Sequence, residues 1–179
     1  MATLKPQDVA VVLKLCCYAP QRPPYSVIAS ELSMSPSEVH AAVKRALGSR
    51  LLHGPKPTER PNYAAIEEFL IHGLKYAFPA ERGELTRGVP TSYAAEPLRQ
   101  VISLGDEPPP VWPYPTGTQR GIAFGPLYKQ APEAALRDPV LYELLALADA
   151  LRDGRARERK LAEEMMVSRL RFLRSTVHV

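Results

Sequence analysis

The stretch "LSMSPSEVHAAVKRA", residues 32–46, contains a complete set of signals for the start of a helix. Ser35 can accept a hydrogen bond from the amide of Glu38, whose side chain can reach back to the Ser35 amide, forming a capping box. Pro36 suits the first helical position because its missing N–H has no intrahelical partner there. Apolar residues then follow at helical spacing, which predicts a buried stripe on a helix over residues 36–47, formed by Val39, Ala42, Val43 and Ala46.

Two further helices are predicted before this stretch. Residues 7–18 carry apolar side chains at helical spacing and end before a proline-rich connector. A short helix is expected over Val27–Leu32, with Ser26 as its N-cap. Only Ser33, Met34 and Ser35 separate it from the helix that begins at Pro36. Three helices with so short a turn between the second and third predict a helix-turn-helix unit.

The residues after the third helix extend this pattern. Leu51–His53 is predicted to be a short strand, and residues 54–61 are rich in proline and carry two cations. No second strand is evident, and Asn62 is expected to cap a helix over 64–77. Residues 7–62 resemble the helix-turn-helix of bacterial winged-helix regulators. The resemblance implies that helix 36–47 enters the major groove of DNA and that residues 54–61 form the wing.

The predicted DNA contacts lie opposite the buried stripe and in the wing. Small and hydrogen-bonding side chains near the start of a recognition helix allow close approach to base edges, and cations further along can reach phosphates. Another interpretation is that this face is simply solvated in a module that binds proteins. The candidate DNA-binding residues are Ser35, Ser37, His40, Ala41, Lys44, Arg45, Lys56 and Arg60.

The charge distribution favours a polyanionic partner for the first third of the chain. The formal net charge is +4, and residues 1–62 carry eight Lys and Arg against four Asp and Glu.

No apolar run approaches the roughly 20 residues that a membrane span needs. Pro6 and Asp8 interrupt what would be the apolar core of a secretory signal. Cys16 and Cys17 are adjacent and are expected to be reduced core thiols, which favours a cytoplasmic protein.

The rest of the chain is predicted to be a helix followed by an irregular proline-rich region, residues 63–137, and C-terminal helices, residues 138–179. Short extended pieces are expected at Pro110–Tyr114 and Gly121–Phe124, and a short helix at Thr91–Ile102. The strong helix after Asp138 carries a long apolar stripe, and the preceding region offers few apolar residues in regular elements to cover it. An uncovered stripe predicts a homodimer or partner interface, formed by Leu141, Leu144, Leu145, Ala148 and Leu151.

Together these patterns predict a mainly α protein with an N-terminal winged helix-turn-helix (residues 1–62), a proline-rich extended connector and a C-terminal helical region. The expected function is sequence-specific binding of double-stranded DNA as a homodimeric transcriptional repressor. The alternative is a protein-interaction module, such as an antitoxin-like partner of an enzyme. The histidines are scattered and no HExxH, GxSxG or phosphate-loop motif is present, so no catalytic residue, metal or cofactor is expected. Whether the aromatic and proline-rich stretch binds a small effector or only packs stays open.

Overall fold

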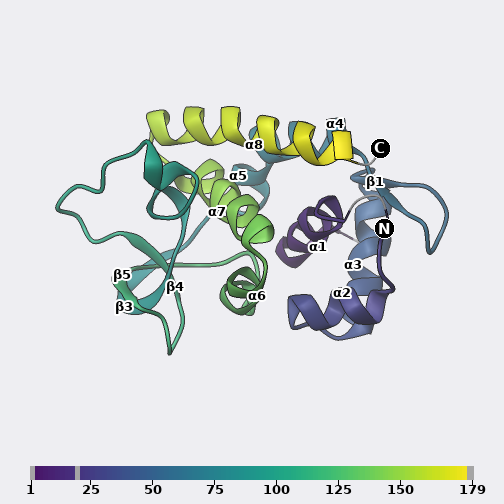
Figure 1. The fold of residues 1–179 in the computed structure, drawn as a ribbon, viewed down its shortest axis with the longest axis horizontal. Helices are drawn as coiled ribbons and strands as arrows, with labels where there is room; N and C mark the ends of the chain where they lie inside the picture. Colours follow the sequence, from purple (N-terminus) through teal and green to yellow (C-terminus); the bar gives the residue numbers. More distant parts are fainter. Residues whose placement is uncertain (1–2, 19–20, 177–179) are drawn as a thin grey trace.

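The computed structural model describes residues 3–18 and 21–176, and it is mostly helical (56%) with small sheets. The N-terminal helices are α1 (Pro6–Cys16), α2 (Tyr25–Leu32) and α3 (Pro36–Gly48). They lie together at the right of Figure 1, with α2 and α3 joined by a tight turn. Ser33 makes this turn in the left-handed conformation, with φ 53° and ψ 42°. The predicted three-helix unit with a short turn is therefore confirmed.

The start of α3 matches the predicted capping box. The Ser35 hydroxyl accepts a hydrogen bond from the Glu38 amide at 3.2 Å, and the Ser35 amide donates to Glu38 Oε2 at 2.8 Å. Pro36 occupies the first turn. The four stripe residues of α3 are completely buried, as predicted. Together the cap and the stripe fix both the starting point of α3 and the face that it turns to the core.

Replacing Ser35 with alanine is expected to lower the free energy of unfolding by about 1 kcal/mol, because one amide in the first turn of α3 loses its acceptor. Urea unfolding followed by circular dichroism measures the change. Ser30→Ala is the matched control, since Ser30 is exposed and lies within α2. Equal stability of the Ser35 variant and the wild type would contradict this role of the cap.

The start of α2 differs from the prediction. The helix begins at Tyr25 rather than Val27, and Pro24 rather than Ser26 occupies the N-cap position. Pro24 is extended, at φ −63° and ψ 159°, and its carbonyl accepts hydrogen bonds from the amides of Val27 and Ile28. The proline thus directs the chain into the helix without a side-chain cap, and the assignment of Ser26 as N-cap is wrong.

A small wing follows α3, and it contains the second strand that the sequence did not indicate. Strand β1 (Leu52–His53) pairs antiparallel with β2 (Arg60–Pro61), with Leu52 opposite Pro61 and His53 opposite Arg60. Two residues per strand are too few to show an alternating pattern, which explains why β2 was missed. Gly54 allows the chain to leave β1 with a φ of 95°.

The helix predicted over 64–77 is present but interrupted. Asn62 caps it as expected, accepting a hydrogen bond from the Ala65 amide at 3.4 Å. The helix is divided into α4 (Tyr63–Glu68), a π-helical segment (Phe69–Gly73) and α5 (Leu74–Ala77). Its buried side chains, Ile66, Leu70 and Leu74, belong to the main core.

The middle of the chain folds into a β unit rather than an irregular connector. Strand β3 (Arg82–Pro90) pairs antiparallel with both β4 (Pro110–Pro113) and β5 (Gln119–Phe124), and the β4–β5 pairing is parallel. The three strands close into a barrel, at the lower left of Figure 1. The two extended pieces were predicted, but β3 was not, because most of its first six side chains are exposed and show no apolar alternation. The helix expected at Thr91–Ile102 is wrong, since this segment forms only two 3₁₀ turns, Ser92–Ala94 and Leu98–Gln100.

The C-terminal part contains three helices, α6 (Ala131–Arg137), α7 (Pro139–Asp153) and α8 (Ala156–Thr176). Asp138 caps α7, as its Oδ1 accepts hydrogen bonds from the amides of Val140 and Leu141 at 3.1 Å. The apolar stripe of α7 is buried within one chain, because α1, α5 and α8 all pack on this helix. Figure 1 shows α8 lying across α7 and reaching α4. The inference of a homodimer from an uncovered stripe therefore loses its basis.

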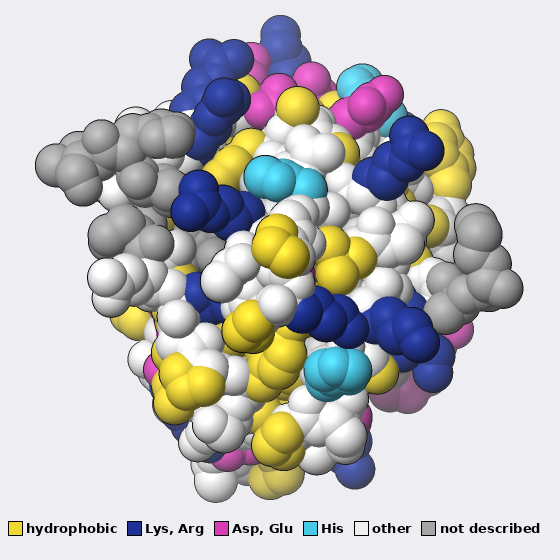
Figure 2. All heavy atoms as spheres, turned by 90° about the vertical axis from the view of Figure 1, so that its right-hand side faces the viewer, with side chains coloured by type: hydrophobic (Ala, Val, Ile, Leu, Met, Phe, Trp, Pro, Cys, Tyr) yellow, Lys and Arg dark blue, Asp and Glu magenta, His cyan; other side chains and the backbone are white. Residues whose placement is uncertain are grey.

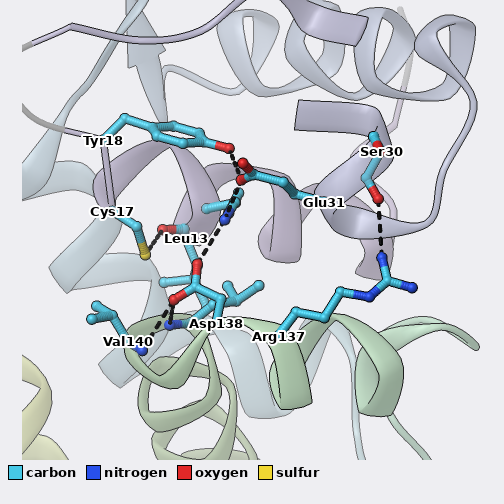
Figure 3. A network of polar contacts seen from close by, with 10 residues as sticks. Leu13, Cys17, Tyr18, Ser30, Glu31, Arg137, Asp138 and Val140 are labelled. Carbon is cyan, nitrogen blue, oxygen red and sulfur yellow. Dashed lines mark hydrogen bonds and ion pairs between the residues drawn. The ribbon is translucent and has the colours of Figure 1, made fainter. Parts of the chain in front are cut away.

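A buried lysine, Lys14, connects α1 with α2 and with the start of α7. Figure 3 shows its partners Glu31 and Asp138. The Lys14 ammonium is 2.6 Å from a carboxylate oxygen of Glu31 and 2.6 Å from one of Asp138. The Tyr18 hydroxyl donates a hydrogen bond to Glu31. Hydrogen bonds from Lys14 and Tyr18 lower the pKa of Glu31. The network joins the helix-turn-helix to the C-terminal helices through charge as well as through the shared apolar core.

The lowered pKa of Glu31 predicts a pH-dependent contribution to stability. A carboxyl group whose pKa is lower in the folded state stabilises the fold above its unfolded pKa, near 4.5, and this contribution is lost as the pH falls through the folded pKa. Glu31→Gln should therefore lower the melting temperature at about pH 7, and the difference from the wild type should shrink below about pH 4. The exposed Glu84→Gln serves as the control. A Glu31→Gln deficit that does not change with pH would contradict this assignment.

Candidate nucleic-acid interface

The outward face of α3 presents polar and basic side chains. Ser37, His40 and Lys44 are exposed, and the small Ala41 between them is half-buried. Ser35 lies at the end of the helix, with its hydroxyl engaged by Glu38. Figure 2 shows the side of the molecule that carries the helix-turn-helix and the wing. Lys, Arg and His side chains are distributed over this side, and most acidic side chains lie toward its edges.

The wing brings a further cation next to α3. Lys56 Nζ lies 3.5 Å from His40 Nε2, although the two residues are 16 positions apart. The His40 ring also meets the Tyr25 ring edge-on, with centroids 5.9 Å apart. Within the described residues Lys44 and Lys56 form no ion pair, so both ammonium groups are available to an external anion. The structure thus brings Lys56 of the wing next to His40, on the face of α3 that also carries Lys44.

Arg45 differs from the other candidates because its guanidinium is already used within the chain. Its Nε and Nη2 donate to the two carboxylate oxygens of Asp8, each at 2.7 Å. The Asp8 side chain is completely buried, and that of Arg45 is 12% exposed. This contact raises the pKa of Arg45. Asp8 also accepts a hydrogen bond from the Lys5 amide at the start of α1. Arg45 therefore attaches α3 to α1 and is not a free cation on the recognition face.

Arg60 also lies apart from the face of α3, beside a wing anchor that the sequence did not reveal. The neighbouring Glu59 is buried, and its Oε1 accepts a hydrogen bond from the Tyr25 hydroxyl at 2.7 Å. Arg22 Nη1 lies 2.8 Å from Glu59 Oε2. The carboxylate therefore ties the wing to the start of α2. The exposed Arg60 lines a pocket behind the wing together with His53 and Arg174.

The cysteines and histidines have other positions. Cys16 is buried and Cys17 half-buried, and both are free thiols, as expected. Burial raises the pKa of Cys16 well above its ordinary value and that of Cys17 to about 12, which disfavours the reactive thiolate. His178 lies outside the described residues. In the ranges 3–18 and 21–176, no three His, Cys, Asp or Glu side chains are grouped so that they could hold a metal ion.

Comparisons with known protein families, with curated proteins and with solved structures found no match to this chain. Among the described residues no helix is both long and apolar enough to span a lipid bilayer. The candidate interface consists of one helix with a buried inner stripe and a polar, cationic outer face, next to a short wing.

Proposed function

We propose that the protein is a sequence-specific DNA-binding transcription regulator that reads double-stranded DNA with α3. The observation that carries this proposal is the division of α3 into two faces. Its inner stripe is completely buried against the core, whereas Ser37, His40 and Lys44 on the outer face are exposed. A helix seated in this way after a tight turn has the arrangement that places a recognition helix in a major groove.

The candidate contacts divide by chemistry. Ser37 and His40, near the start of α3, supply hydrogen-bonding groups for base edges, and Ala41 leaves room for close approach. Lys44 and Lys56 supply ammonium groups for phosphates. Ser35 keeps its capping role at the end of the helix that would be nearest the DNA. Arg45 contributes indirectly, because it holds α3 on α1.

The proposal includes a homodimer that represses transcription by occupying an operator. A single recognition helix contacts too few base pairs for selectivity in a genome, and two-fold symmetry doubles the number of contacts. Because the α7 stripe is covered within the chain, the dimer contact would have to use another surface. Light scattering with and without operator DNA tests this part of the proposal separately.

Replacing Lys44 with alanine is expected to weaken binding to DNA and to leave the fold unchanged. Loss of one phosphate contact should reduce the slope of log K against log salt by about one unit. The measurement begins with selection of bound sequences from random duplexes, and then follows fluorescence anisotropy of the selected duplex over a salt series. Lys129→Ala removes an equal charge from an exposed site in the β5–α6 connection and serves as the control.

Three outcomes separate DNA binding from protein binding. A steep salt slope with a defined selected sequence supports a regulator. Salt-dependent binding without sequence selection indicates a non-specific DNA contact. If the wild type does not bind mixed duplexes even at low salt, α3 is not a DNA reader, and a protein-interaction role accounts better for its exposed face.

A further inference from the structure

A pocket of about 590 Å³ lies behind the wing, and neither His40 nor Lys56 is among its lining residues. Its walls come from the end of α1, the connector before α2, both strands of the wing, the start of α4 and the end of α8. The volume falls within the range of small-molecule sites in proteins. Segments distant in the sequence therefore meet around a space large enough for a ligand.

The charge of the pocket favours an anion with two negative charges. Three arginines are among its lining residues, Arg22, Arg60 and Arg174. One of them, Arg22, is neutralised by the buried Glu59, at 2.8 Å. Within the part of the chain that the structure describes, Arg60 and Arg174 form no ion pair and donate no side-chain hydrogen bond. Two guanidinium groups match a phosphate monoester, which carries about −1.5 to −2 charges at neutral pH.

The remaining lining favours a flat, partly apolar body attached to that phosphate. Tyr18 and Tyr63 contribute aromatic rings, and Pro57 and Pro61 contribute apolar ring surfaces. The lining residues therefore include both charged and apolar side chains, which suits a ligand of mixed character better than a lipid or a bare ion. His53 adds a ring that can donate or accept a hydrogen bond to heteroatoms of the ligand, whereas the Asn62 side chain is engaged at the start of α4.

From these features we propose that the pocket binds a nucleoside monophosphate. Arg60 and Arg174 hold the phosphate, and the tyrosine and proline surfaces hold the base and sugar. This site is separate from the outer face of α3, and its ligand is a free nucleotide rather than a duplex. The proposal does not depend on the DNA-binding function, because nucleotide binding is measured on the full chain without DNA.

The test is a titration of the ¹⁵N-labelled full chain with AMP, followed by amide chemical shifts of His53, Arg60 and Asn62. Saturable shifts with a dissociation constant below about 1 mM are expected. Two control ligands are titrated in the same way. Adenosine has the base and sugar without the phosphate, and inorganic phosphate is the anion alone. Both should bind at least about tenfold more weakly than AMP, since each lacks one half of the interaction.

The double variant Arg60→Gln/Arg174→Gln should weaken AMP binding at least about tenfold, because both charge-assisted contacts are lost. Arg87→Gln/Arg157→Gln makes the same change in net charge at exposed residues of β3 and α8 that do not line the pocket, and should bind AMP as the wild type does. No saturable shift with AMP would overturn the proposal. Equal binding by the two double variants would also overturn it, as would inorganic phosphate binding as tightly as AMP.

Discussion

Replacing Arg45 with alanine is expected to lower the free energy of unfolding by about 3–5 kcal/mol, because it leaves the buried carboxylate of Asp8 without its charged partner. The Asp8 side chain is completely buried, and the two hydrogen bonds from Arg45 are its contacts with positive charge. The remaining hydrogen bond from the Lys5 amide cannot compensate for the desolvation of an ionised group. Urea unfolding at neutral pH measures the loss.

The adjacent Lys44→Ala is the matched control, since Lys44 is exposed and its removal should change the stability by no more than about 0.5 kcal/mol. Asp8→Asn/Arg45→Met removes both charges, and it should recover part of the stability that Arg45→Ala loses.

The single variants Lys44→Ala and Arg45→Ala also separate folding from recognition. Under conditions in which both variants are folded, Lys44→Ala should weaken DNA binding more than Arg45→Ala does. A stable Arg45→Ala variant that no longer binds DNA would assign Arg45 to the interface instead.

The helix-turn-helix was predictable because its determinants are local. Ser35, Pro36 and Glu38 lie within one helical turn, so the capping box is visible in the sequence without knowledge of the fold. The buried stripe of α3 repeats at helical spacing, and its apolar neighbours, α1 and α2, are close in the sequence. Local signals of this kind identify where a helix begins and which of its faces is outward, and therefore most of the candidate interface.

The parts that the sequence did not predict depend on distant pairings. Strand β3 exists because it pairs with β4 and β5, and its charged outer half shows no apolar alternation. Asp8 and Arg45 are 37 positions apart, so nothing in the neighbourhood of either residue indicates their contact. The apolar stripe of α7 was evident, but whether it packs on this chain or another depends on tertiary structure. The sequence thus shows which surfaces need partners and leaves open which partners they have.

A further buried carboxylate, that of Asp149, holds the β unit against α7. Its Oδ2 accepts hydrogen bonds from Thr91 Oγ1 and Trp112 Nε1, both at 2.7 Å, and its Oδ1 accepts one from Arg152 at 2.8 Å. Arg152 in turn donates to the carbonyl oxygens of Phe78 and Gly125. Asp149 therefore accepts hydrogen bonds from Thr91, at the end of β3, and from Trp112 in β4. It also contacts Arg152, which binds the backbone on either side of the β unit.

Asp149→Ala is accordingly expected to cost about 3–5 kcal/mol of stability, since it removes the acceptor of three donors at once in a buried site. Trp112 is the only tryptophan, so its fluorescence during urea unfolding reports directly on this position. Asp149→Asn keeps one acceptor oxygen and should lose less stability than Asp149→Ala. Asp153→Ala, which breaks an exposed pair with Arg82, should change stability by no more than about 1 kcal/mol. If Asp149→Ala unfolds at the same urea concentration as Asp153→Ala, the β unit is held on α7 by its other contacts, and the buried carboxylate has no part in positioning it.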